Sequence, residues 1–128
     1  MYKIAVVDDD ELCGLAIQRF FRQEVEVSVF TKVSSFLREP CLYDLVIVDF
    51  SIPPANYEKN MDGCQLICHL KQTLPSPPLL VLSTGFCSKT EVELGRNICP
   101  QADDFIAKDA GLEAILQQVK QLLDSRKR

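Results

Sequence analysis

The stretch Leu45-Val46-Ile47-Val48-Asp49 decides the fold, and the rest of the chain is arranged around it. Four apolar residues in a row, three of them β-branched, lead into a carboxylate, with Tyr43-Asp44 before the run and Ser51-Ile52-Pro53-Pro54 after it. A short continuous apolar run bounded by turn residues is typical of a strand buried on both faces of a parallel sheet. Open α/β sheets bind ligands at the carboxyl ends of their strands, so Asp49 stands at a candidate site.

An acid at a strand end can simply cap the following turn, but polar residues close three other apolar runs of this chain as well. These are 3–7 with Asp8-Asp9-Asp10, 79–82 with Ser83-Thr84, and 105–107 with Lys108. Right-handed crossover connections would bring the ends of parallel strands to one edge of the sheet. We therefore expect carboxylates, a hydroxyl and an ammonium group to share one shallow pocket.

Helical periodicity alternates with these strands. In the first expected helix Gln18, Arg19 and Arg22 fall on the polar face, and Asp10 is placed to cap the helix. Its apolar positions are Leu12, Cys13, Ala16, Ile17, Phe20 and Phe21. Further helices are expected around Phe36-Leu37 with Ser34 or Ser35 as cap, then over 66–74, over 88–97 and over 112–123.

The alternation of Val25, Val27 and Val29 with polar residues predicts a strand at the edge of the sheet. Five strands alternating with five helices predict a doubly wound α/β fold, a parallel sheet with helices on both faces.

The composition limits the class of protein. A chain of 128 residues is long enough for one domain, which we expect to span 1–125, with 126–128 as a basic tail or the start of a linker. The net charge of -4 argues against direct binding of nucleic acid or an anionic membrane. No apolar stretch is long enough to span a membrane and no signal peptide is visible, so a cytoplasmic location is expected.

The six cysteines form no paired C-x-x-C framework. Cys64 and Cys68, with His69 beside them, could be pictured as metal ligands on one helix face. Two thiols one helical turn apart are more often small core residues of a cytosolic protein.

The expected pocket has a definite chemistry. Several carboxylates close together repel one another, so they need protons or a cation. Oxygen ligands at a shallow site suit Mg²⁺, which retains water and takes further ligands from a phosphate group. A lysine and a hydroxyl can hold phosphoryl oxygens, and a carboxylate that accepts a phosphoryl group becomes an acyl phosphate. The sequence therefore predicts Mg²⁺-assisted phosphoryl transfer to an aspartate.

The chain resembles the response-regulator receiver domain of two-component signalling over essentially its whole length. The matching segments are 3–10, 43–49, Pro53, Asp62-Gly63, 102–108 and the amphipathic last helix. This resemblance implies a CheY-like, flavodoxin-like (βα)5 fold with the strand order 2-1-3-4-5. It also implies a signalling domain rather than an enzyme.

The resemblance implies a role for each residue of the pocket. Asp49 would be the phosphoacceptor, supplied by the phosphohistidine of a sensor histidine kinase or a phosphotransfer protein. Asp9, Asp49 and the backbone carbonyl of Ser51 would ligate Mg²⁺, with Asp8 acting largely through water. Lys108 would pair with Asp49 or with its phosphoryl group.

The resemblance also implies two switch residues. Counting from Pro78 assigns the hydroxyl that contacts the phosphoryl group to Ser83, whereas aligning Gly85 with the family's small residue would assign it to Thr84. We favour Ser83. Phe105 matches an aromatic residue whose rotamer follows the switch, although it could equally be an ordinary half-buried aromatic.

The chain departs from the family in two further places. Asp109 follows Lys108 where the family usually has proline, often after a cis bond, so we predict a trans bond here. Gly63 lies 14 positions beyond Asp49, which makes the connecting loop longer than usual, and Tyr57-Glu58-Lys59 could overhang the site.

Two other functions compete with phosphorylation of Asp49. One is a pseudo-receiver that is never phosphorylated and acts as a protein-interaction module. The other is a haloacid-dehalogenase-type phosphatase with Asp8 of the Asp8-x-Asp10 motif as nucleophile, but that family is longer and leaves Asp49 without a role. The sequence names neither the downstream output partner nor the oligomeric state, and a homodimer is compatible with it.

Overall fold

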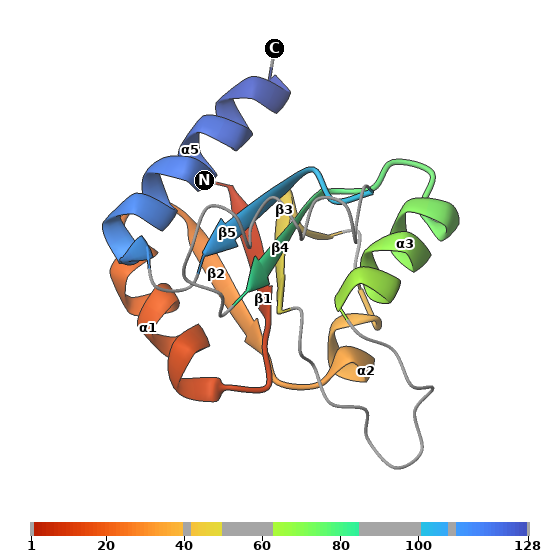
Figure 1. Cartoon of the computed structure of the whole chain (residues 1–128), viewed down its shortest axis with the longest axis horizontal. Coiled ribbons are helices and arrows are strands. Elements are labelled where there is room, and N and C mark those ends of the chain that lie inside the picture. Colours follow the sequence, from red (N-terminus) through yellow and green to blue (C-terminus); the bar gives the residue numbers. More distant parts are fainter. Residues whose placement is uncertain (1, 40–41, 50–62, 85–100, 108–109, 128) are drawn as a thin grey trace.

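The computed structural model describes residues 2–39, 42–49, 63–84, 101–107 and 110–127, and for Thr84, Arg126 and Lys127 it describes the backbone only. Strands and helices alternate along the chain (Figure 1). They are β1 (Lys3–Val7), α1 (Glu11–Phe21), β2 (Glu26–Phe30), α2 (Val33–Phe36), β3 (Leu45–Asp49), α3 (Gly63–Thr73), β4 (Leu79–Thr84), β5 (Asp104–Ala107) and α5 (Leu112–Lys127).

The five strands form one sheet in the order β2-β1-β3-β4-β5, and every neighbouring pair is parallel. This confirms the flavodoxin-like fold and the order 2-1-3-4-5. β3 lies in the middle, between β1 and β4, and all five of its residues are buried. The run 45–49 is therefore the central strand, covered on both faces, that its composition predicts.

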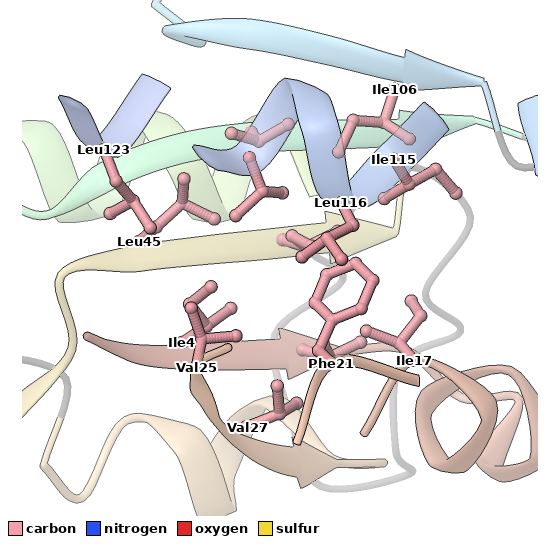
Figure 2. Close-up of a cluster of buried hydrophobic side chains, with 14 residues drawn as sticks. Ile4, Ile17, Phe21, Val25, Val27, Leu45, Ile106, Ile115, Leu116 and Leu123 are labelled. Atoms are coloured by element: carbon pink, nitrogen blue, oxygen red, sulfur yellow. The ribbon is translucent and has the colours of Figure 1, made fainter. Parts of the chain in front are cut away.

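Helices cover both faces of the sheet, with α1 and α5 on one side and α2 and α3 on the other (Figure 1). Successive residues of a strand point to opposite faces, so Leu45 and Ile47 belong to the core under α1 and α5, whereas Val46 and Val48 belong to the core under α2 and α3. Figure 2 shows the first of these cores, where Phe21 of α1 and Leu116 of α5 lie among the strand residues. Burial on both sides fixes the register of β3, and with it the position of Asp49.

Two local predictions are confirmed. β2 is an edge strand, and within it Val27 is buried while Glu26 is exposed. Asp10 is the N-cap of α1, since its Oδ1 accepts hydrogen bonds from the backbone nitrogens of Leu12 (3.1 Å) and Cys13 (3.4 Å).

The predicted apolar face of α1 is wrong in part. The row Cys13, Ile17 and Phe21 lies towards the sheet, but the adjacent row is open to solvent: Leu12 is 78% exposed, Phe20 is 46% exposed and Ala16 is exposed too. The helix is rotated so that its buried Gly14 lies against Val29 of β2. The same rotation brings Gln18, predicted on the polar face, to the sheet edge, where its Nε2 donates to the carbonyl oxygen of Val27 (2.9 Å).

The predicted caps of α2 are wrong. Lys32 occupies the N-cap position without a side-chain hydrogen bond, and Ser34 and Ser35 lie inside the helix. Burial of Val33 together with Phe36 against the sheet places the start of the helix earlier than the serines would. Packing here outweighs capping preference.

The helix predicted over 88–97, the loop 50–62 and the Lys108–Asp109 peptide bond lie outside the described residues. α5 continues through Lys127. Within the described part of the chain, no helix is both long and apolar enough to cross a membrane.

Candidate functional site

Three carboxylates meet at the carboxyl-terminal edge of the sheet. Oxygen atoms of Asp8, Asp9 and Asp49 all lie within 4.8 Å of one another. β1 and β3 are adjacent and parallel, and Val7 pairs with Val48. The next residues along the chain, Asp8 and Asp49, therefore lie side by side at the ends of these strands. The structure thus brings together the three acids that the sequence predicted.

The three acids differ in their surroundings. Asp8 and Asp49 are buried, with 3% and 5% of their surface exposed, whereas Asp9 is exposed. The carboxylate of Asp8 accepts a hydrogen bond from the backbone nitrogen of Asp10 (2.9 Å), and the backbone nitrogen of Asp8 donates to the carbonyl oxygen of Phe30 (2.9 Å). These bonds fix the turn that carries the acids, while Asp10 itself is occupied in capping α1.

Ser83 lies next to Asp49. The two residues are register partners on β4 and β3, and Ser83 is 5% exposed. Among the described residues no hydrogen bond to the Ser83 hydroxyl is found. A buried hydroxyl without a protein partner can bond to water or to a group that binds beside Asp49.

Asp8, Asp49 and Ser83 also line a cavity of about 120 Å³ under α1 and α5. Its other walls are mainly apolar: Val6, Cys13, Ala16, Ile17, Ile47, Ile106, Leu112 and Ile115. Apolar walls reduce dielectric screening, so charges at this edge act more strongly on one another and on a bound ion than they would in water.

Phe105 is 6% exposed and packs in the core under α2 and α3, so it is more deeply buried than the half-buried aromatic considered from sequence. Its backbone nitrogen donates to Asp104 Oδ1 (2.8 Å) and its carbonyl oxygen accepts from Gln118 Nε2 (2.7 Å). Gln118 also donates to Asp104 Oδ2 (2.8 Å). This link between β5 and α5 was not predicted, because its only signal in the sequence is an amide beside the apolar stripe of the last helix.

Several predicted site residues are not placed. Lys108 and Ser51 lie outside the described residues, and the Thr84 side chain is not described. In the described ranges, the three aspartates are the one group of side chains arranged to hold a metal ion. Cys64 and Cys68 are half-buried cysteines of α3, and Cys64 packs against the core under α2 and α3.

The chain matches known receiver domains. The family model described as response regulator receiver domain matches residues 4–120. No protein with a curated description matches the chain.

Solved structures of receiver domains have the same fold. The BeF3-activated DrrB receiver domain is 28% identical and superposes with a TM-score of 0.76, with 97% of this chain and 98% of that chain covered. The longer DrrB chain, an OmpR/PhoB homologue of Thermotoga maritima, is 28% identical with a TM-score of 0.78, and 98% of this chain covers 54% of it. The BeF3-activated receiver domain of Klebsiella pneumoniae RstA is 25% identical, with a TM-score of 0.71 and 94% and 97% coverage.

Proposed function

Because this chain belongs to the response regulator receiver domain family, we propose that Asp49 accepts a phosphoryl group from the phosphohistidine of a sensor histidine kinase or a phosphotransfer protein. The acyl phosphate then controls a downstream output partner. The observation that carries the proposal is the close group of Asp8, Asp9 and Asp49, with the buried Ser83 hydroxyl in register with Asp49.

Asp49 is the best placed of the three acids to be the acceptor. It ends the central strand, with acids from β1 on one side and Ser83 of β4 on the other. Asp8 is committed to the backbone nitrogen of Asp10, and Asp9 is exposed to solvent. Only Asp49 combines burial, neighbouring carboxylates and a hydroxyl donor.

The donor set fits Mg²⁺. Carboxylate oxygens are the ligands that this ion prefers, and the three aspartates bring oxygens within 4.8 Å of one another. We propose that Asp9, Asp49 and the carbonyl of Ser51 bind the ion directly and that Asp8 binds it through water. Bound Mg²⁺ supplies positive charge that offsets the charge of the phosphoryl oxygens.

The transfer is a substitution at phosphorus. A carboxylate oxygen of Asp49 forms a bond to the phosphorus, the phosphorus–nitrogen bond of the donor breaks, and its electron pair returns to the imidazole ring. The Ser83 hydroxyl donates a hydrogen bond to a phosphoryl oxygen, and Lys108 pairs with the new negative charge. We assign the switch hydroxyl to Ser83 rather than Thr84 because Ser83 is buried beside Asp49.

The competing functions have less support. A phosphatase with Asp8 as nucleophile would need Asp10 as its second acid, but Asp10 caps α1 and is not one of the three grouped carboxylates. The buried Ser83 hydroxyl, for which the described part of the chain offers no hydrogen-bond partner, favours a phosphorylated receiver over a pseudo-receiver.

Incubation with Mg²⁺ and acetyl phosphate tests the proposal, with intact-mass spectrometry as the measurement. The wild-type protein should gain one acid-stable, base-labile phosphoryl group, and Asp49→Asn should gain none while remaining folded. Asp10→Asn is the matched control, because asparagine caps helices as well as aspartate does and this acid lies outside the group. Labelling of Asp49→Asn at the wild-type level would refute the assignment.

A further inference from the structure

We infer that Gly63 is a positioning residue for Asp49, and that the absence of a side chain at Gly63 holds the phosphoacceptor in register with Ser83. The inference rests on the proposed function of Asp49. Gly63 is the first residue of α3 and is buried. It lies directly against the backbone of Asp49, so the first residue of α3 contacts the last residue of β3.

The contact leaves no room for a methyl group. A Cβ atom at Gly63 would lie 2.9 Å from the carbonyl carbon of Asp49, closer still to its carbonyl oxygen, and 3.0 Å from Cδ1 of Leu82. The obstacle is mainly backbone, which cannot rotate aside as a side chain can. A larger residue at 63 therefore has to move the Asp49 peptide group or the start of α3.

The requirement for glycine here is steric and not conformational. Among the described glycines only Gly111 has a positive φ, so the backbone of Gly63 suits any L-residue. Alanine would also favour the helix that begins at this position. Any loss caused by Gly63→Ala is therefore due to the space that the Cβ atom takes, which overlaps mainly the backbone of Asp49.

The effect on the chemistry should be large for so small a change. Asp49 must keep its distance to Asp8, Asp9 and Ser83. Asp8 and Asp9 directly follow β1 and Ser83 lies in β4, and both strands contribute side chains to both cores. A displacement on the order of 1 Å in a reacting group can lower a rate about 100-fold. We expect Gly63→Ala to slow phosphorylation by about 10- to 100-fold and to weaken Mg²⁺ binding.

Gly14 offers a matched control. It is also a buried glycine in a helix that lies against a strand, and a Cβ there would meet Cγ1 of Val29. Its obstacle is a side chain of β2 rather than the backbone of Asp49. Gly14→Ala should lower stability without changing the site, and adding Val29→Ala should relieve the contact.

The experiment compares wild type, Gly14→Ala and Gly63→Ala in three measurements. These are the rate of phosphorylation by acetyl phosphate, the Mg²⁺ dissociation constant from calorimetry, and the amide NMR shifts of Asp49 and Ser83. Gly63→Ala should change all three, and Gly14→Ala should stay within about twofold of wild type in rate and affinity. If either variant is partly unfolded, all three proteins are compared in trimethylamine N-oxide, which favours the folded state.

Equal behaviour of the two variants in all three measurements would overturn the inference. Recovery of the wild-type rate, Mg²⁺ affinity and amide shifts when Leu82→Ala is added to Gly63→Ala would also overturn it. That result would mean that the Cβ atom collides with a side chain and not with the Asp49 backbone. If wild type takes no phosphoryl group, the proposed function fails, but the amide shifts still decide whether Gly63 positions Asp49.

Discussion

The environment of the Ser83 hydroxyl disfavours the stability of the folded protein and suits the binding of a hydrogen-bond acceptor. It is 5% exposed, lies beside Asp49, and has no hydrogen-bond partner for its hydroxyl among the described residues. Leaving a buried hydroxyl unpaired costs about 1–3 kcal/mol in proteins. If Asp49 is phosphorylated as proposed, a phosphoryl oxygen would give this hydroxyl a partner and would offset that cost.

Replacing Ser83 by alanine should therefore raise the free energy of unfolding of the unphosphorylated protein by about 1 kcal/mol. The same change should weaken the structural response to phosphorylation, because the donor to the phosphoryl oxygen is lost. Urea denaturation measures the first effect, with the exposed Ser76→Ala as control. A variant less stable than wild type would show that the hydroxyl is already satisfied.

Some features of single residues can be predicted from the sequence alone, and others cannot. The Asp10 cap is predictable because an N-cap depends only on residues two and three positions away. The exposure of Leu12 is not, because it depends on how α1 is rotated, and that is set by the contact of Gly14 with Val29. The contact of Gly63 with Asp49 is equally non-local, although the Asp62-Gly63 pair is visible in the sequence.

At the scale of elements, each edge strand of the sheet accepts a hydrogen bond from a glutamine of a neighbouring helix. Among the described strands, β2 and β5 each pair with one neighbour only. Gln18 of α1 donates to Val27 of β2, and Gln118 of α5 donates to Phe105 of β5. Unpaired backbone groups on an edge strand can template pairing with another chain. These two amides satisfy part of each edge and tie it to its covering helix.

Gln18→Ala and Gln118→Ala should each lower the free energy of unfolding by about 0.5–1.5 kcal/mol, the net contribution of one hydrogen bond. Gln118→Ala should cost more than Gln18→Ala, because Gln118 bonds to Asp104 as well as to Phe105. It should also speed amide hydrogen exchange at Phe105. Gln117→Ala is the exposed control on the same helix, and an equal loss of stability in that variant would contradict the edge role.

Element types follow from periodicity more readily than element boundaries do. The central run 45–49 is a strand with the predicted bounds, since burial on both faces leaves a continuous apolar signal. The start of α2 is misplaced because two serines imitate a cap, while the burial of Val33 and Phe36 sets the helix. A helix of four residues is too short for its apolar periodicity to show where it begins.

At the scale of the molecule, negative charge is concentrated at the carboxyl-terminal ends of the central strands. Asp49 is distant in sequence from the adjacent pair Asp8-Asp9 and meets it only after folding, so the fold itself creates the repulsion between Asp49 and that pair. The strand order that brings them together came from the family resemblance and is confirmed. Periodicity alone predicts a parallel sheet but does not order its strands.

Mg²⁺ should therefore stabilise the folded protein. Binding to the folded form alone at ten times the dissociation constant adds about 1.4 kcal/mol to the free energy of unfolding. A thermal melt with MgCl₂, compared with NaCl of matched ionic strength, should show a higher Tm that is lost in Asp9→Asn. The same rise in that variant would mean that the ion binds away from the three aspartates.

The most direct test of the account is to identify which carboxylate carries the phosphoryl group. After incubation with acetyl phosphate and Mg²⁺, borohydride reduction converts the acyl phosphate to a stable alcohol, which peptide mass spectrometry can locate. The account predicts modification at Asp49 and at neither Asp8 nor Asp9, because only Asp49 ends the central strand beside Ser83. Modification at Asp8 in place of Asp49 would contradict it.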